Sequence, residues 1–130
     1  MITGVHTLIY SDDEAATRAF LTDVLRWPSI DAGGGWLIFR TGPSELGVHP
    51  TVSEWAGPDG EMQRYESPRH HQISLVCDDL AATMAELTER GAEFTRAARD
   101  DGYGLTVEVA VPGADPILVY EPRHPLAMDL

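Results

Sequence analysis

The sequence predicts an α+β fold built from two similar units, and three observations lead to that prediction. Residues 6–22 match residues 72–88 without a gap, at an offset of 66 positions. Each stretch begins as an apolar, strand-like run and continues with apolar residues at helical spacing. The two halves also end alike, because Val48-His49-Pro50 matches Tyr120-Glu121-Pro122 at an offset of 72 positions. A strand and helix that recur in this way indicate a duplicated unit.

The length and composition predict one soluble domain. A chain of 130 residues buries a sizeable core, whereas each half alone would be marginal, so we expect the halves to share a sheet or a groove. No apolar run reaches the ~18 residues of a membrane span. The single cysteine, Cys77, suits a reducing compartment, and its alignment with Ser11 favours a structural role. We therefore expect a cytoplasmic protein.

The formal net charge of −12 restricts the choice of partners. Nucleic acid and anionic membranes both favour a basic surface, so neither is expected to bind. A cationic small molecule would suit the acidic balance if the charge gathers near a groove. The other interpretation is that the acidic surface serves solubility alone.

The first unit, residues 1–50, is expected to run strand, helix and three strands. Residues 5–10 are apolar and rich in β-formers. Ser11-x-x-Glu14 is a capping-box pattern that opens a helix over 13–25, which Trp27-Pro28 ends. Turn residues then separate three expected strands, at 29–32, 36–40 and 45–49.

The second unit, residues 70–122, repeats this order. A strand over 70–77 leads to a helix over 79–90, with Gly91 as its C-terminal cap. The three strands after it are expected at 93–95, 105–111 and 117–121. Residues 51–69 between the units are polar, with Gly57-Pro58-Asp59-Gly60 at their centre, and are interpreted as a linker or lid.

Four short motifs carry a resemblance to a known family: Gly4-Val5-His6, Asp78-Asp79-Leu80, Gly91-Ala92-Glu93-Phe94 and Val119-Tyr120-Glu121-Pro122. In these motifs the chain resembles the vicinal oxygen chelate superfamily, which includes glyoxalase I, extradiol dioxygenases and bleomycin-binding resistance proteins. It implies two tandem βαβββ modules that form curved mixed sheets around a central groove, with the helices outside. It also implies a homodimer.

In metal-using members of that superfamily, the first and last strands of each unit supply four ligands. The resemblance implies that these positions are His6, Leu46, Gln72 and Leu118 here. Leucine cannot bind a metal, and a catalytic divalent site needs at least three imidazole or carboxylate ligands. We therefore expect no resident cofactor.

A shifted phase of the strands gives an alternative. If the last strands run one residue out of the assumed phase, Glu121 and either Glu45 or His49 would point into the groove. His6, His71, His49 and Glu121 would then form a chemically competent set. Such a site would hold zinc, manganese, nickel or iron. The protein would then be a metal-dependent lyase, isomerase or dioxygenase.

The expected groove is largely apolar, which is the usual form of a small-molecule site. Its expected lining residues are Tyr10, Leu46, Gln72 and Leu118, with Trp55 and Tyr103 as aromatic residues that close over a ligand or pack locally. His6 would be the general base if the chain is catalytic. The favoured function is a small-molecule-binding protein of the bleomycin-resistance type, with a small cationic or aromatic ligand, and the alternative is the metal-dependent enzyme.

Overall fold

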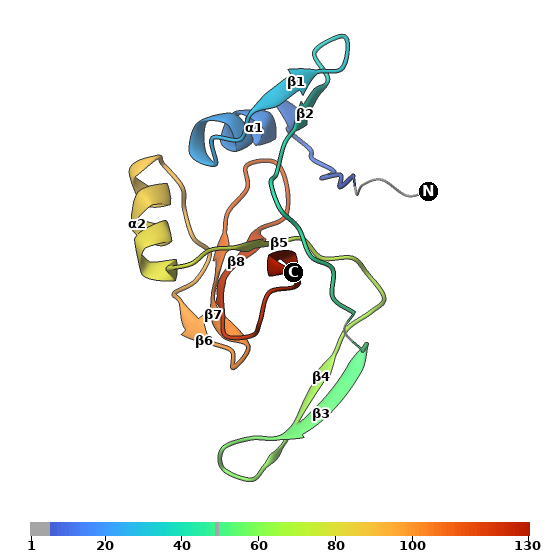
Figure 1. Cartoon of the computed structure of the whole chain (residues 1–130), viewed down its shortest axis with the longest axis vertical. Helices are drawn as coiled ribbons and strands as arrows, with labels where there is room; N and C mark the ends of the chain where they lie inside the picture. Colours follow the sequence, from blue (N-terminus) through green and yellow to red (C-terminus); the bar gives the residue numbers. More distant parts are fainter. Residues whose placement is uncertain (1–5, 49) are drawn as a thin grey trace.

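The computed structural model describes residues 6–48 and 50–130, and these residues confirm the predicted α+β class (Figure 1). The largest sheet has the strand order β5-β8-β7-β6. Its strands are β5 (Ser74–Val76), β6 (Arg99–Asp100), β7 (Gly104–Val109) and β8 (Ile117–Pro122). β5 runs parallel to β8, and the other neighbouring strands are antiparallel. Helix α2 (Leu80–Glu89) lies beside this sheet, so residues 70–122 follow the predicted order of strand, helix and three strands. The strand expected at 93–95 is wrong in position: Phe94 forms only an isolated bridge with Val109, and β6 comes later in the chain.

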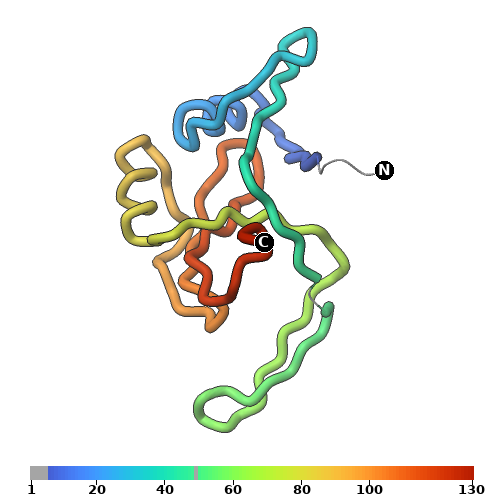
Figure 2. Tube along the Cα trace, viewed as in Figure 1, coloured from blue at the N-terminus to red at the C-terminus, as the bar shows by residue number. Residues whose placement is uncertain are grey.

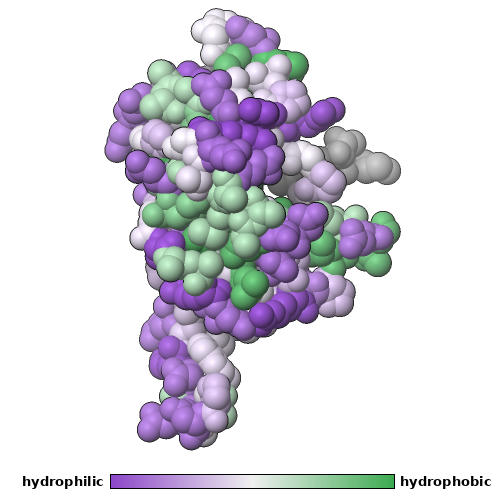
Figure 3. Space-filling view, turned by 90° about the vertical axis from the view of Figure 1, so that its left-hand side faces the viewer, coloured by the Kyte–Doolittle hydropathy of each residue, from purple (hydrophilic) through white to green (hydrophobic). Residues whose placement is uncertain are grey.

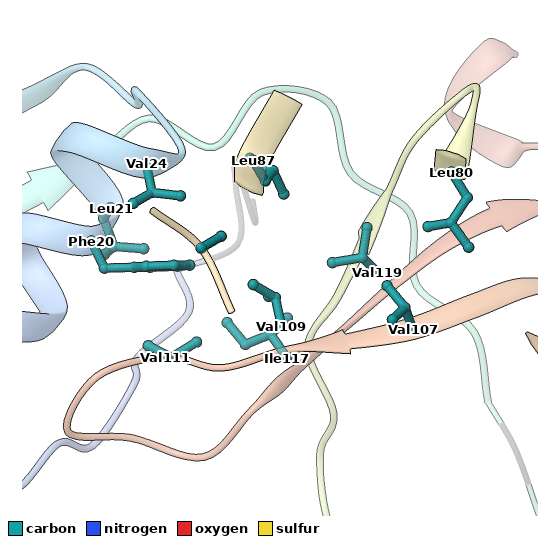
Figure 4. Packing of buried hydrophobic residues seen from close by; sticks show 11 residues of the cluster. Phe20, Leu21, Val24, Leu80, Leu87, Val107, Val109, Val111, Ile117 and Val119 are labelled. Carbon is teal, nitrogen blue, oxygen red and sulfur yellow. The ribbon is translucent and has the colours of Figure 1, made fainter. Parts of the chain in front are cut away.

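The hydrophobic core lies between the sheet and the two helical segments. Figure 4 shows side chains from β7 and β8 converging with those of both helical segments. The buried apolar residues are Phe20, Leu21, Val24, Leu80, Leu87, Ala92, Val107, Val109, Val111, Ile117 and Val119. Side chains alternate between the two faces of a strand, so Ile117 and Val119 mark the covered face of β8. The opposite face of the sheet points away from α2, and we call it the open face.

The first helical segment differs from a regular helix over 13–25. α1 (Glu14–Ala19) continues into a π-helical stretch, η1 (Phe20–Val24), which ends before Arg26 at a φ of 57°. Phe20, Leu21 and Val24 are all buried in the core. Apolar spacing in the sequence does not distinguish a π-turn from an α-turn, so the sequence pattern did not indicate this change.

Equivalent aspartates begin the two helices. Asp13 Oδ1 accepts a hydrogen bond from the Ala16 amide at 3.1 Å, and Asp79 Oδ1 accepts one from the Ala82 amide at 2.9 Å. Each carboxylate satisfies one of the amides that a helix start leaves without an intrahelical partner. Asp13, and not Ser11 of the capping-box pattern, is therefore the N-cap of α1.

A turn of the second unit docks on the start of α1. The Gly113 carbonyl accepts a hydrogen bond from the Asp12 amide at 2.8 Å, and Thr17 Oγ1 donates to the Pro112 carbonyl at 2.6 Å. Thr17 is buried by this contact. Gly113 has a φ of +82°, which a residue with a side chain adopts only at a cost. The two halves are thus joined through backbone carbonyls.

Two of the four strands expected in the first unit are formed. β1 (Ser29–Asp31) and β2 (Leu37–Phe39) pair in antiparallel fashion. The strands expected over 5–10 and 45–49 are wrong for the described parts, because residues 6–10 and 45–48 are irregular. In the second unit the corresponding strands, β5 and β8, pair with each other, whereas these two segments form no such ladder. Val5 and His49 lie outside the described residues.

The segment over 51–69 contains a hairpin that the linker interpretation omitted. β3 (Val52–Ala56) and β4 (Met62–Glu66) pair in antiparallel fashion, and the Gly57 amide donates to the Glu61 carbonyl at 2.7 Å in the turn. The hairpin projects from the body as an arm (Figures 1 and 2). At the C-terminal end, a short 3-10 turn, η2 (Ala127–Asp129), follows β8. No helix within 6–48 and 50–130 is long and apolar enough to cross a membrane.

Candidate functional site

The open face of the four-stranded sheet carries a mixed row of apolar and polar side chains. Strand register places Leu118 of β8 between Ser74 of β5 and Glu108 of β7. One step along, Tyr120 lies between Val76 and Thr106. Cross-strand neighbours of this kind share a face, because side chains alternate along each strand. The open face is therefore defined by Ser74, Val76, Thr106, Glu108, Leu118 and Tyr120.

Polar groups flank Leu118 on both sides. Gln72 Nε2 donates to Ser74 Oγ at 3.2 Å, which brings Gln72 to this face beside the start of β5. On the other side, Glu108 Oε2 accepts a hydrogen bond from Thr95 Oγ1 at 3.1 Å. The structure thus brings together the predicted residues Gln72 and Leu118. It adds the carboxylate of Glu108, which alternation along the predicted strand over 105–111 would have indicated.

Aromatic rings gather around Tyr120. Its ring meets the Tyr103 ring edge-on, with centroids 5.7 Å apart, and the His124 ring lies 5.9 Å away. The Tyr120 hydroxyl is 3.2 Å from His124 Nε2. Burial raises the pKa of Tyr120, and the nearby Glu45 carboxylate raises it further. The pKa of Tyr103 is also raised, chiefly by burial. Both phenols therefore stay neutral at physiological pH, and the predicted Tyr103 belongs to this cluster.

The C-terminal tail meets the same cluster. Glu45 Oε2 accepts a hydrogen bond from the Ala127 amide at 2.7 Å, and Glu45 also acts on the Tyr120 hydroxyl. His124, three residues before the tail's last turn, supplies the ring contact with Tyr120. No sequence pattern indicated this arrangement, because the packing of a tail on its own sheet is set by tertiary contacts. Glu45 thus supplies a carboxylate near the aromatic rings, and Glu108 supplies a second one on the open face opposite Leu118.

A hydrogen-bonded network holds Thr106 at the next position of the open face. Arg96 Nη2 donates to Thr106 Oγ1 at 2.9 Å, and that hydroxyl donates to Asp101 Oδ2 at 2.7 Å. Burial acts to raise the pKa of Asp101, but hydrogen bonds from Thr106 and Arg99 outweigh it, and the pKa is lowered. Thr106 is fully buried although it lies on the open face. This network therefore fixes the position of Thr106 within the sheet.

Other residues of the predicted groove lie away from this cluster. Tyr10 is 87% exposed and, with Asp12 and Asp115, lines a shallow hollow of about 320 Å³ beside the docked turn. Leu46 is 82% exposed in the extended segment before the arm, and Trp55 lies on the arm itself. His6 is exposed in the segment that precedes α1. The groove roles of these residues stay predictions.

The alternative metal set requires Glu121 on the open face. Glu121 Oε2 instead accepts a hydrogen bond from the Leu80 amide at 3.0 Å, so its carboxylate caps α2 on the covered side. His71 is exposed, three residues before β5 begins, and His49 lies outside the described residues. Within 6–48 and 50–130, no three His, Cys, Asp or Glu side chains are grouped to hold a metal ion. The metal-ligand set that includes His49 therefore stays a prediction.

Sequence comparison identifies the class of protein. A model of the Glyoxalase/Bleomycin resistance protein/Dioxygenase superfamily matches residues 4–122. The chain therefore belongs to this superfamily, in agreement with the resemblance noted from its motifs. A comparison with curated protein sequences gives no match.

Solved structures show the same fold at low sequence identity. A lactoylglutathione lyase from Agrobacterium tumefaciens is 18% identical, with a TM-score of 0.57 over 88% of this chain and 90% of that chain. An integron cassette protein from the mobile metagenome of V. cholerae is 12% identical, with a TM-score of 0.53 over 93% and 98% of the two chains. A superfamily member from Sphaerobacter thermophilus is 21% identical, with a TM-score of 0.50 over 92% and 98%. These likenesses show the fold alone.

Proposed function

We propose that this protein binds a small cationic or aromatic molecule on the open face, as a binding protein of the glyoxalase/bleomycin-resistance type. The observation that carries the proposal is the grouping of Tyr103, Tyr120 and His124 with the carboxylate of Glu45. Leu118 and Val76 supply apolar surface beside these rings. An apolar surface with a few fixed polar groups is the usual form of a small-molecule site.

The charge of the site favours a cation. Aromatic faces attract cations with about 0.5–2 kcal/mol, and more when water is excluded. Glu108 is half-buried on the same face, so a cation beside Leu118 would meet a carboxylate that is only partly screened by water. The net charge of −12 adds a long-range attraction for the same kind of ligand.

In metal-using members of the superfamily, two positions carry carboxylate ligands. The residues found at those positions here favour binding over metal catalysis. Leu118 occupies one of these positions on the open face. Glu121, which belongs to the alternative metal set, accepts a hydrogen bond from the Leu80 amide at the start of α2. The metal-dependent alternative would need Glu121 to leave α2 and turn to the opposite face of β8. We therefore place the binding function first.

Calorimetric titration with trimethyl(phenyl)ammonium, beside its neutral isostere tert-butylbenzene, tests the proposal. We expect the cation to bind more tightly than the neutral compound. Glu108→Gln should lower the affinity for the cation and leave the affinity for the neutral compound unchanged. Tyr120→Leu should lower the affinity for both compounds. Glu89→Gln, on the exposed end of α2, is the matched control for the loss of one carboxylate. Equal affinities of the wild type and Glu108→Gln for the cation would contradict the site.

Metal content separates this proposal from the enzyme alternative. The tag-free chain, purified without chelator and then offered zinc, manganese, nickel and iron, is expected to retain none stoichiometrically. Stoichiometric metal that is lost in His6→Ala would favour the metal-dependent alternative. Glu121→Gln and His49→Ala would then be the next variants to measure.

A further inference from the structure

The tail that follows β8 is anchored at Arg123. The Arg123 amide donates to the Tyr103 carbonyl at 2.8 Å, and the guanidinium pairs with the Asp100 carboxylate. The hydrogen bond from Arg123 is the main cause of the lowered pKa of Asp100, so this carboxylate stays charged at neutral pH. Of the seven residues over 124–130, five are exposed and two are half-buried. A segment with this little burial opens at a low cost in free energy, so the tail can move about Arg123.

The residues beyond Arg123 fold back onto the open face. The contact of His124 with Tyr120 places them there, and Figure 1 shows η2 beside β8. The arm formed by β3 and β4, in contrast, projects away from the body in two perpendicular views (Figures 1 and 3). The tail is therefore the mobile segment that meets the aromatic cluster.

The tail engages two groups that a cationic aromatic ligand would use. Glu45 Oε2 accepts a hydrogen bond from the Ala127 amide at 2.7 Å. The ring of His124 is inclined at 32° to that of Tyr120, closer to stacked than to edge-on. The tail thus presents a partly positive N–H group to the carboxylate and a ring to the phenol, as such a ligand would.

The Tyr120 hydroxyl is engaged by the tail as well. The Pro125 carbonyl can only accept, so His124 Nδ1, 2.8 Å away, carries a proton. In the neutral imidazole, Nε2 then accepts a hydrogen bond from the Tyr120 hydroxyl at 3.2 Å. A ligand that takes the place of His124 has to replace a hydrogen bond in addition to a ring contact.

We propose that residues 124–130 form an autoinhibitory strap, which a cationic aromatic ligand displaces when it binds to the open face. This inference rests on the proposed function, because it assigns the same face to the ligand. The ligand takes the place of the His124 ring at Tyr120 and of the Ala127 amide at Glu45. Its apparent affinity is the intrinsic affinity multiplied by the fraction of chains whose strap is released. A neutral aromatic compound replaces the ring contact but not the contact with the carboxylate, so the strap favours cations.

One substitution removes a strap contact and leaves the backbone path intact. Proline at position 127 has no amide hydrogen, so Glu45 loses its donor. Leu126 has a φ of −97° and a ψ of 125°, the extended conformation that a residue before proline requires. Position 127 is also the first residue of η2, where proline is well tolerated. Ala127→Pro should therefore release the strap without strain.

Calorimetric titration of Ala127→Pro with trimethyl(phenyl)ammonium tests the strap. A hydrogen bond to a charged acceptor is worth on the order of tenfold in an equilibrium constant, so the Kd for the cation should fall by roughly 10-fold. Ala127→Ser is the matched control, because it changes the side chain and retains the amide, and its Kd should equal that of the wild type. An unchanged Kd in Ala127→Pro would overturn the proposal.

His124→Ala gives a second test, in which the sign of the change decides. If the His124 ring blocks Tyr120, its removal should lower the Kd for the cation. A raised Kd would mean that His124 belongs to the surface that holds the ligand, and the strap would be refuted while the proposed function stands. Binding that Glu108→Gln weakens and Ala127→Pro does not alter would have the same meaning. If neither the wild type nor any variant binds the cation, the proposed function itself fails.

Amide hydrogen exchange, followed by NMR, measures the release directly. The Ala127 amide is bonded to Glu45 in the free protein and should exchange faster as trimethyl(phenyl)ammonium saturates the site. The Ala82 amide, which donates to Asp79 at the start of α2, is the internal control and should keep its rate. Slower exchange of the Ala127 amide would show that the tail closes over the ligand, and an unchanged rate would show that it stays in place; either result would overturn the displacement.

Discussion

Gly113→Ala tests the docked turn that joins the two halves. A Cβ at this position would lie 2.7 Å from Ser11 Oγ, 2.8 Å from the Asp13 carbonyl oxygen and 2.9 Å from Asp13 Cβ. The hydroxyl can rotate away, but the backbone carbonyl cannot, so the turn has to move. A left-handed φ of +82° adds a cost of about 1–2 kcal/mol for any residue with a side chain.

Moving the turn also weakens two hydrogen bonds to the start of α1. Each of the bonds from the Asp12 amide and the Thr17 hydroxyl contributes about 1 kcal/mol. We therefore expect Gly113→Ala to lower the free energy of unfolding by about 3 kcal/mol. For a chain of this size, that corresponds to a Tm lower by on the order of 10 °C.

The assay is urea unfolding, followed by far-UV circular dichroism at one fixed protein concentration. Gly102→Ala is the matched control, because Gly102 has a φ of +85° and nothing within 4 Å of the added Cβ. The control should show only the backbone cost of about 1–2 kcal/mol. If Gly113→Ala is no more destabilising than Gly102→Ala, the docked turn does not contribute to stability and the reasoning is refuted.

Three further outcomes are expected. Glu121→Ala should cost about 1–3 kcal/mol in urea unfolding because it leaves the Leu80 amide without its acceptor, and Glu121→Gln should recover most of that loss. The lowered pKa of Asp101 gives stability that is present above the ordinary aspartate pKa and is lost as pH falls through the folded value. Thr106→Val, which removes one of the hydrogen bonds that lower this pKa, should therefore shift acid unfolding to higher pH; an unchanged midpoint would count against this role. Burial chiefly raises the pKa of the Cys77 thiol, so Cys77 should react with Ellman's reagent more slowly than free cysteine at neutral pH, and a rate equal to that of free cysteine would contradict this.

The second unit was the more predictable half of the chain. Its helix and last two strands combine a local signal with tertiary support: Asp79 caps the helix, Val107 lies between the polar residues Thr106 and Glu108, and Val119 is buried in the core. In the first unit, the strand-like composition of residues 6–10 was not sufficient. A strand also requires a neighbour for its backbone groups, and this chain does not provide one there.

The arm shows a signal that was present but interpreted too weakly. Pro58-Asp59-Gly60 is a turn sequence, and β-formers such as Val52 and Tyr65 flank it. The polar residues between them obscured the alternation, since both faces of the hairpin are exposed. Alternation of apolar and polar residues identifies a strand because one of its faces is buried. It cannot identify these two strands, since the chain buries neither face of the hairpin.

The candidate site was predicted only in part, because local alternation indicates some of its residues and tertiary contacts bring in the others. Gln72 and Leu118 share a face, as the alternation of the second unit suggested, whereas the approach of Glu45 and His124 depends on how distant segments fold back. Glu121 could not be assigned from its own strand. Its role at α2 depends on the position of a helix start 41 residues earlier.

The docked turn has a consequence for the protein's synthesis. The hydroxyl of Thr17 at the start of α1 finds its acceptor on Pro112, 95 residues later in the chain. At a translation rate of about 5–20 residues per second, the ribosome takes roughly 5–20 s to make the intervening segment. During that time α1 lacks this acceptor, and the apolar residues of η1 lack the strands that will cover them. The nascent first half therefore keeps these apolar residues uncovered until the second half has been made.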